Sequence, residues 1–209
     1  MKPKMKSISF GQWVDQIKPQ KKILDSLSVK VVKNISKLKG EPVWMLKRRL
    51  EALKIFKKIS LPKWGPDLTK LNFGKIHYYS RSAGVAENDW QKVPGKIKKT
   101  FDRLGVPKLE AEFLGGAGAQ YDSEMVYHSL DKDLKAQGVI FLSLEQAISK
   151  YPKLVKKYFG QVVPTKDNKL AALNSAVWSG GSFIYVPPKV KVKRPLHAYF
   201  RLNARGLGQ

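Results

Sequence analysis

NKLAALNSAVWSGGSFIYVPPKVKVKRPLHAYFRLN, residues 168–203, carries the clearest structural pattern of this chain. Its β-branched and aromatic residues come in three short bursts, at 182–186, 190–193 and 196–202, with proline or glycine between them. That spacing predicts consecutive short strands rather than helices, because β-branched and aromatic residues favour strands and Pro and Gly interrupt them. A corner about every seven to ten residues is typical of a sandwich, a barrel or a coiled parallel solenoid.

Two kinds of corner residue frame the first of these strands. Gly180 and Gly181 form a permissive backbone corner that leads into a strand too apolar to lie bare on a surface. Pro187 and Pro188 remove two backbone donors in succession, which excludes them from a central strand. The sequence therefore predicts a covered strand between two fixed corners.

Two segments of this stretch, ALNSAVWSGGSFIYVP at 172–187 and YFRLN at 199–203, resemble the SufB members of the SufB/SufD family, the scaffolds of the SUF iron–sulfur cluster assembly machinery. Upstream segments stand in the same order as similar segments of that family: EPVWML at 41–46, LPKWGPDL at 61–68, GAGAQYDSE at 116–124, GVIFL at 138–142 and YFGQVVP at 158–164. The resemblance runs from about residue 30 to the last residue.

The resemblance implies an α+β fold, with a helical N-terminal region followed by the first strands of a right-handed parallel β-helix. The charge distribution marks a basic N-terminal segment at 1–40, the mixture of elements predicts an α+β domain at 41–167, and the resemblance implies the start of the β-helix core at 168–209. Members of the family continue well past the position of Gln209, so the resemblance also implies a truncated chain. Whether that chain is a truncated gene product, a split subunit or an independent fragment stays open.

The function that the resemblance implies is that of a non-enzymatic scaffold component in cluster assembly. Its implied partners are a SufC-like ATPase and a SufD-like subunit. The full-length family carries an iron–sulfur cluster, but its cluster-bearing residues and most partner surfaces lie further along the chain. We therefore expect no catalytic, cofactor-binding or metal-binding residue, and no cofactor, in this chain.

The composition bounds these expectations. With 209 residues, 43% of them hydrophobic, the chain can bury a core in one or two domains. It has no cysteine, so it can build neither a disulfide framework nor a thiolate-ligated iron–sulfur site. No apolar run approaches the roughly 20 residues of a membrane-spanning helix. We expect a soluble, cytoplasmic protein that does not contact a membrane.

A net charge of +24 is the compositional outlier. Residues 1–63 hold 17 basic and 4 acidic side chains, so the excess is concentrated at the front of the chain. This asymmetry raises the alternative that the chain is a basic nucleic-acid-binding module. Most of the charges are single lysines, which lack the forked geometry that arginine offers to phosphates. A solvated lysine-rich face, with only weak and non-specific nucleic-acid binding, is the favoured interpretation.

Two helices are predicted near the front. The first, at 21–39, rests on apolar residues at four-residue spacing, and the second follows Gly40 with Pro42 in its tolerated first turn. The apolar stripe of the second helix consists of Val43, Leu46, Leu50, Leu53 and Phe56. Basic residues such as Arg49 flank that stripe, which could place the helix on a membrane or along RNA. Docking onto a protein core is the favoured interpretation.

Helices and strands are mixed further along. Short helices are expected at 94–104, 107–114 and 131–135, with an extended segment at 124–130 and a strand at 139–142. Ser143, with Gln146 at the third position, forms the pattern of a capping box that starts another helix. A further helix begins at Pro152 and ends at Gly160. This mixture is what predicts the α+β class.

Catalytic constellations are scarce in this sequence. GGAGAQ at 115–120 has neither a GK[ST] terminus nor a GxGxxG pattern before a helix, so a tight turn is favoured over a phosphate-binding loop. Asp122 and Glu124 could be posed as paired carboxylates, yet alternate positions on a strand point to opposite faces. The histidines lie in three different segments, and structural roles are favoured for His77, His128 and His197.

The C-terminal strands would form only one or two coils of a β-helix, whereas roughly three repeats are usually needed for stability. We therefore expect the apolar residues of these strands to be only partly covered, namely Phe183, Ile184, Tyr185, Tyr199, Phe200 and Leu202. The chain should then either self-associate through these open strands or keep them dynamic.

Overall fold

The computed structural model describes residues 15, 17–82, 87–103, 113–203 and 206–208, and this part of the chain forms seven α-helices and seven strands. The helices are α1 (Val29–Leu38), α2 (Val43–Lys58), α3 (Gly95–Arg103), α5 (Lys132–Ala136), α6 (Leu144–Lys150), α7 (Pro152–Tyr158) and α8 (Lys169–Val177). The strands are β1 (Lys21–Ile23), β2 (Tyr79–Arg81), β3 (Gly116–Tyr121), β4 (Glu124–Leu130), β5 (Ile140–Ser143), β6 (Ser182–Tyr185) and β7 (Leu196–Arg201). The α+β class is confirmed. In the described residues, no helix has the length and apolar character needed to cross a membrane.

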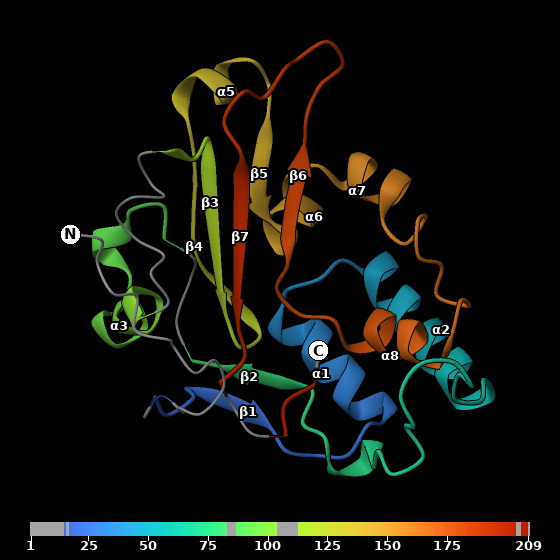
Figure 1. Cartoon of the computed structure of the whole chain (residues 1–209). Helices are drawn as coiled ribbons and strands as arrows, with labels where there is room; N and C mark the ends of the chain where they lie inside the picture. The colour runs from blue at the N-terminus through green and yellow to red at the C-terminus, as the bar shows by residue number, and fades with distance from the viewer. Residues whose placement is uncertain (1–14, 16, 83–86, 104–112, 204–205, 209) are drawn as a thin grey trace.

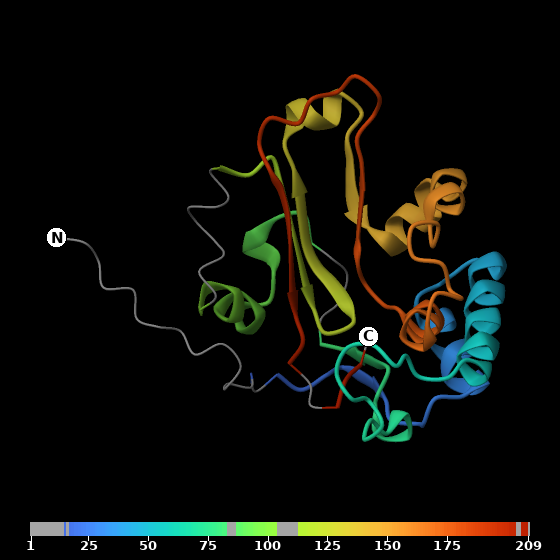
Figure 2. The ribbon, with the colours of Figure 1, turned by 45° about the vertical axis from the view of Figure 1, so that its right-hand side comes forward.

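The strands form three small sheets, and the helices α1, α2 and α8 pack together beside them (Figure 1). One sheet has the strand order β4-β3-β7, and the other two are the pairs β5-β6 and β1-β2. Figure 2 shows the β5-β6 pair as a separate layer that faces the larger sheet. Glycines let the two layers approach, because a Cβ atom on Gly116 or Gly118 would lie 3.0 or 3.2 Å from the Phe141 ring of β5.

The pairing of the C-terminal strands only partly matches the expected β-helix. β7 lies parallel to β3 in an unbroken register from Gly116–Leu196 to Tyr121–Arg201. β6, in contrast, runs antiparallel to β5. A right-handed parallel β-helix is therefore not seen in the described residues, and the division of the chain at residues 40 and 167 stays a prediction.

Residues 168–203 also contain more helix and less strand than predicted. Residues 169–177 are helical rather than extended, because KLAALNSAV is rich in helix formers and the Asn168 side chain caps it by accepting from the backbone N–H groups of Leu170 and Ala171. The predicted strand at 190–193 is wrong. Those residues follow a turn in which Lys189 adopts a φ of 68°, and they pair with no strand in the described part of the chain.

Some of the other predicted elements are confirmed and others are wrong. Residues 21–23 form strand β1, paired with β2, so the predicted helix at 21–39 begins only at Val29, after the Ser28 cap. The segment 115–120 is not a tight turn, since most of it lies in β3. The predicted helix at 94–104 is confirmed by α3, whereas the one at 107–114 falls mostly outside the described residues. The helices near 131–135 and 152–160 and the strand near 139–142 are also confirmed.

The buried face of α2 contains a charge that the apolar stripe did not predict. Val43 is 71% exposed, and the face that packs toward α8 includes Arg49, whose side chain is fully buried. Arg49 binds the Glu41 carboxylate through Nε at 2.7 Å, donates to the Ala176 carbonyl at 3.1 Å, and stacks over the Trp178 ring at 4.3 Å. Arg49 therefore joins the start of α2 to the end of α8, and α2 docks onto the protein core as expected.

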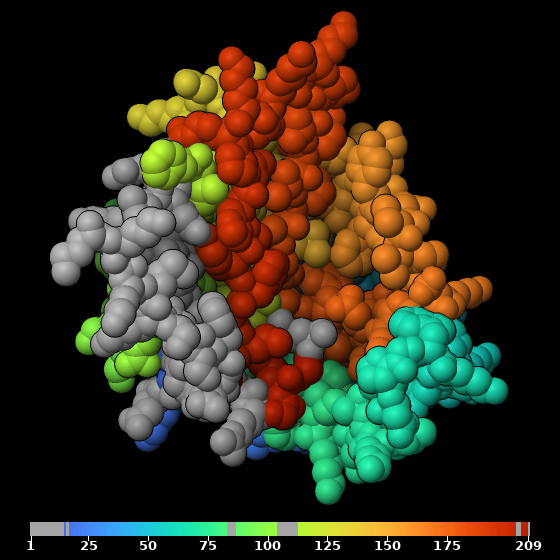
Figure 3. Space-filling view, viewed as in Figure 1, coloured from blue at the N-terminus to red at the C-terminus, as the bar shows by residue number. Residues whose placement is uncertain are grey.

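The expected partial exposure of the C-terminal strands is confirmed, and the prediction that the first of them, at 182–186, is covered is wrong. None of the residues from 182 to 203 is buried, and Phe200 is 60% exposed. Figure 3 shows β7 and the chain after β6 on the surface of this face. Apolar residues of β6 and β7 therefore remain open beside a well-packed helical core.

We expect Arg49→Met to lower the free energy of unfolding by about 3–5 kcal/mol, because the change leaves the Glu41 carboxylate buried without its partner. The double variant Glu41→Gln/Arg49→Met should recover part of that loss. Urea denaturation measures both values.

Glu51 and Lys54 provide the matched control, because they form an exposed pair on the same helix. Lys54→Met should change stability by about 1 kcal/mol or less. Equal effects of Lys54→Met and Arg49→Met would contradict the buried role assigned to Arg49.

Candidate functional site

The Gly180–Gly181 corner, which links α8 to β6, is the first part of the candidate site. Gly180 and Gly181 have φ angles of 72° and 99°, which favour glycine. The Gly181 N–H donates to Gln120 Oε1 at 2.7 Å, and the Gly180 N–H donates to Glu145 Oε1 at 3.0 Å. A Cβ atom on Gly180 would collide with the Gln120 side chain. The predicted permissive corner is thus present, and side chains from β3 and α6 fix it.

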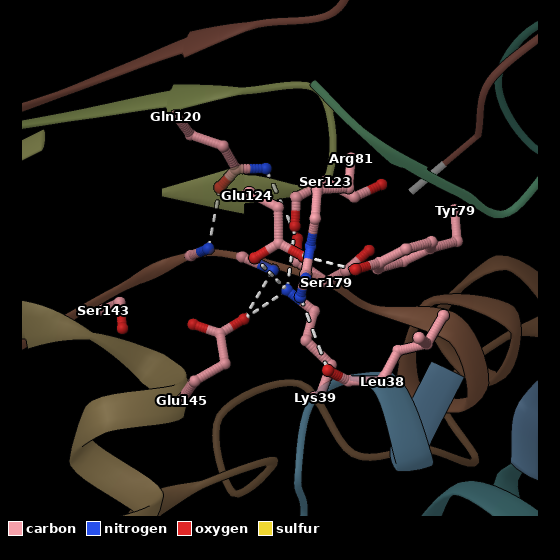
Figure 4. Close-up of polar contacts among 12 residues, drawn as sticks. Leu38, Lys39, Tyr79, Arg81, Gln120, Ser123, Glu124, Ser143, Glu145 and Ser179 are labelled. Atoms are coloured by element: carbon pink, nitrogen blue, oxygen red, sulfur yellow. Dashed lines mark hydrogen bonds and ion pairs between the residues drawn. The ribbon is translucent and has the colours of Figure 1, made fainter. Parts of the chain in front are cut away.

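Lys39 lies at the centre of the site (Figure 4). It is the residue that ends α1, and only 1% of its side chain is exposed. Its ammonium group donates to the Ser123 carbonyl at 2.9 Å, to Glu124 Oε2 at 3.0 Å and to Glu145 Oε1 at 2.7 Å. An ammonium group has three donors, so these three acceptors satisfy it completely. Three segments that are distant in sequence therefore meet at one charge.

Glu124 extends this network toward the β1-β2 sheet. Its second oxygen accepts from the Tyr79 hydroxyl at 2.5 Å and from Arg81 Nε at 3.3 Å. Burial raises the pKa of Tyr79 strongly, and the hydrogen bond to Glu124 adds to the shift, so this phenol stays protonated. We call Lys39, Glu124, Glu145, Gln120 and the Gly180–Gly181 corner the polar hub.

A second network lies on the other side of the β3-β4 turn. Asp122, which has a φ of 50°, accepts from the Ser82 hydroxyl at 3.0 Å and from the Asn203 backbone N–H at 2.8 Å. Asn203 in turn exchanges hydrogen bonds of 2.7 and 3.0 Å with the backbone of Asp15. Asp122 and Glu124 therefore serve different networks and do not form a carboxylate pair. The hydrogen bond from Asn203 to Asp122 also ties the YFRLN segment, residues 199–203, to the β3-β4 turn.

The three histidines remain apart in the structure. The His77 backbone bonds Gly206, His128 is buried in β4, and His197 lies exposed on β7, stacked on Tyr199. Burial, with a contribution from Lys150, lowers the pKa of His128 and keeps the imidazole neutral. Within the described ranges, no three His, Cys, Asp or Glu side chains are grouped to hold a metal ion.

Sequence reasoning found the glycine corner but missed Lys39, Glu145 and Gln120. The confirmed helix start at Ser143 places Glu145 in the first turn of α6, where its carboxylate faces Lys39. Only half of the predicted capping box forms, because Ser143 Oγ accepts from the Gln146 N–H while Gln146 Oε1 has no partner among the described residues. The hub fixes the backbone of the glycine corner and buries the Lys39 charge between two carboxylates. This arrangement suits holding the neighbouring strands in a fixed position.

The lowered pKa of the Glu145 carboxyl predicts how the free energy of unfolding depends on pH. Burial acts to raise its pKa, but the Lys39 ammonium and the hydrogen bonds from Lys39 and Gly180 together outweigh burial and hold the pKa below its ordinary value of 4.5. A lowered folded-state pKa stabilises the fold above about pH 4.5, and this contribution is lost as the pH falls through the folded-state value. The free energy of unfolding should therefore decline in acid, and decline less steeply in Glu145→Gln.

Urea titrations between pH 7 and pH 3 measure this slope. Glu51→Gln, which alters an exposed carboxyl of α2, is the control and should keep the wild-type slope. An identical acid slope in the wild type and Glu145→Gln would contradict the assignment.

Comparisons with known proteins agree with the resemblance. The family model described as the SufBD protein N-terminal region matches residues 20–198. Curated proteins named as iron-sulfur cluster assembly SufBD family proteins, from Staphylococcus aureus strain USA300 and Staphylococcus haemolyticus strain JCSC1435, are each 52% identical to this chain over 183 residues. The match covers 88% of this chain and 39% of each relative, so the chain spans about two fifths of their length. This chain belongs to the SufBD family of iron–sulfur cluster assembly proteins, through the N-terminal region of that family.

Proposed function

We propose that this chain is a SufB-type, non-enzymatic scaffold segment in iron–sulfur cluster assembly. The observation that carries the proposal is the family match over residues 20–198, which includes the hub and the glycine corner. The choice of SufB rather than SufD rests on the segments 172–187 and 199–203, which resemble SufB. Their roles in the structure are to set the corner before β6 and to anchor the end of β7.

The proposed role is to hold β6 and β7 in place and to offer them to further protein. Among the described residues, β7 is one of the two edge strands of its sheet, and β6 forms one edge of the β5-β6 pair. Edge strands present unpaired backbone groups that another strand can bind. Ile184 and Phe200 add exposed apolar surface on these two strands. This geometry supports the addition of further parallel strands beside β7, as in a β-helix.

The partners that we propose are a SufC-like ATPase and a SufD-like subunit, with a cytoplasmic location. Self-association through β6 and β7 is a further proposal, and it rests on the same exposed edges. We propose no cofactor in this chain. The alternative of a nucleic-acid-binding module has no observation in its favour beyond the net charge of +24.

A chimera tests the proposed function. We expect residues 20–198 of this chain, put in place of the matching segment of the Staphylococcus aureus relative, to restore the activity of an iron–sulfur enzyme in cells depleted of that relative. Gly180→Ala in the chimera should abolish the rescue, because Cβ at a φ of 72° is strained and meets Gln120.

Gly95→Ala is the matched control, since a Cβ at Gly95 has open space around it. It should leave the rescue unchanged. A chimera that accumulates as a folded protein yet restores no enzyme activity would overturn the proposed function.

A second prediction concerns the cluster itself. The chain has no cysteine, and thiolates are the usual ligands of these clusters. Anaerobic incubation of the purified chain with iron and sulfide should therefore leave no stable chromophore after desalting. A stoichiometric cluster that survives desalting would refute this, and variants of His77, His128 and His197 would then test ligation by histidine.

A further inference from the structure

The outer face of β3 carries a small cavity with aromatic walls. Ala119 pairs with Tyr127 of β4 on one side and with Tyr199 of β7 on the other, so the three side chains share one face of the sheet. Trp90, from the short 3-10 turn Trp90–Lys92, meets the Tyr127 ring edge to face at a centroid distance of 5.0 Å. We call this cavity, with a volume of about 250 Å³, the aromatic slot; its lining includes Trp90, Ala117, Ala119, Tyr127, Ser129 and Tyr199.

The GAGA sequence of β3 explains why the slot is open. Gly116 and Gly118 face the other side of the sheet, where the Phe141 ring fills the space that side chains would occupy. Ala119 is buried against the core beneath the slot, whereas Ala117 is half-buried and forms part of its floor. The two glycines thus allow close packing on the inner face of β3. The two alanines on the outer face leave room between Tyr127 and Tyr199.

The dimensions of the slot suit a flat group. Neighbouring strands lie about 4.8 Å apart, so β4 and β7 stand about 9.6 Å apart across β3. Tyr127 and Tyr199 take up part of that width and so narrow the space between the two strands. A volume of about 250 Å³ is also smaller than the roughly 300–1,000 Å³ of cavities for drug-sized ligands.

The polar groups of the slot narrow the chemistry further. The Tyr199 hydroxyl is buried and has no hydrogen-bond partner among the described residues, and such a hydroxyl is unfavourable unless it finds one. Asp131 at the rim already binds Arg194 at 2.9 Å, and the hydroxyls of Tyr199 and Ser129 are side-chain groups of the slot that can donate to an incoming group. His197 stacks face to face on Tyr199 at 4.0 Å and therefore covers one face of that ring.

We propose that the aromatic slot binds a planar heteroaromatic group of one or two fused rings, with a ring acceptor that receives the Tyr199 hydroxyl proton as a hydrogen bond. Aromatic walls favour ring stacking and edge contacts, and the alanine floor lets a ring lie close to the sheet. The same ring chemistry is offered by a free nucleoside and by an aromatic side chain of another protein. The Tyr199 hydroxyl favours the nucleoside, since a nucleoside base carries ring-nitrogen acceptors that the rings of Phe, Tyr and Trp lack.

Calorimetric titration of the full chain tests the proposal with two probes, adenosine and N-acetyltryptophanamide. Adenosine should bind saturably and shift the methyl signal of Ala117 in NMR spectra. Ala117→Leu fills the floor and should weaken adenosine binding about tenfold or more, whereas Ala136→Leu, on an exposed position of α5, should not. Tyr199→Phe removes the donor and should weaken binding about two- to tenfold.

Two results would overturn the proposal. One is the absence of saturable binding of adenosine. The other is tighter binding of N-acetyltryptophanamide with no effect of Tyr199→Phe, which would assign the slot to a protein side chain. Should Ala117→Leu fail to fold by circular dichroism, the Ala117 methyl shift and Tyr199→Phe still decide the question.

Discussion

The buried Lys39 ammonium is the interaction on which the rest of the structure depends. A buried charge is tolerated only when partners surround it, and removing one partner leaves the others uncompensated. Lys39 therefore requires Glu124 from the β3-β4 hairpin and Glu145 from α6 at the same time. Because Glu145 also accepts from the Gly180 N–H, the constraint passes from the end of α1 to the corner that begins β6.

The sequence predicted what local chemistry controls. Gly180 and Gly181 adopt the left-handed backbone that only a corner of glycines accepts readily, Ser143 caps α6, and the helix after Pro42 packs on the core. The mixture of helices and strands identified the α+β class. The exposure of apolar residues such as Phe200 was predictable, because the sequence offers only a few strands to cover them.

What the sequence could not predict depends on contacts between distant segments. Lys39 is one of 40 basic residues and has no local mark that distinguishes it from a surface lysine. Arg49 was placed beside an apolar stripe, because its partner Glu41 and the ring of Trp178 come together only in the fold. Residues 21–23 became a strand because β2 pairs with them, which overrides a helix-like spacing.

The polar hub thus joins the C-terminal strands to the helical core. Amide hydrogen exchange in monomeric samples of the wild type and Lys39→Met tests this link. We expect slow exchange at Gly180 and Gly181 in the wild type, because side chains of the hub accept from both N–H groups, and a loss of that protection in Lys39→Met that exceeds the loss in α2. Protection of Gly180 and Gly181 that is unchanged in Lys39→Met would show that the hub does not hold this corner.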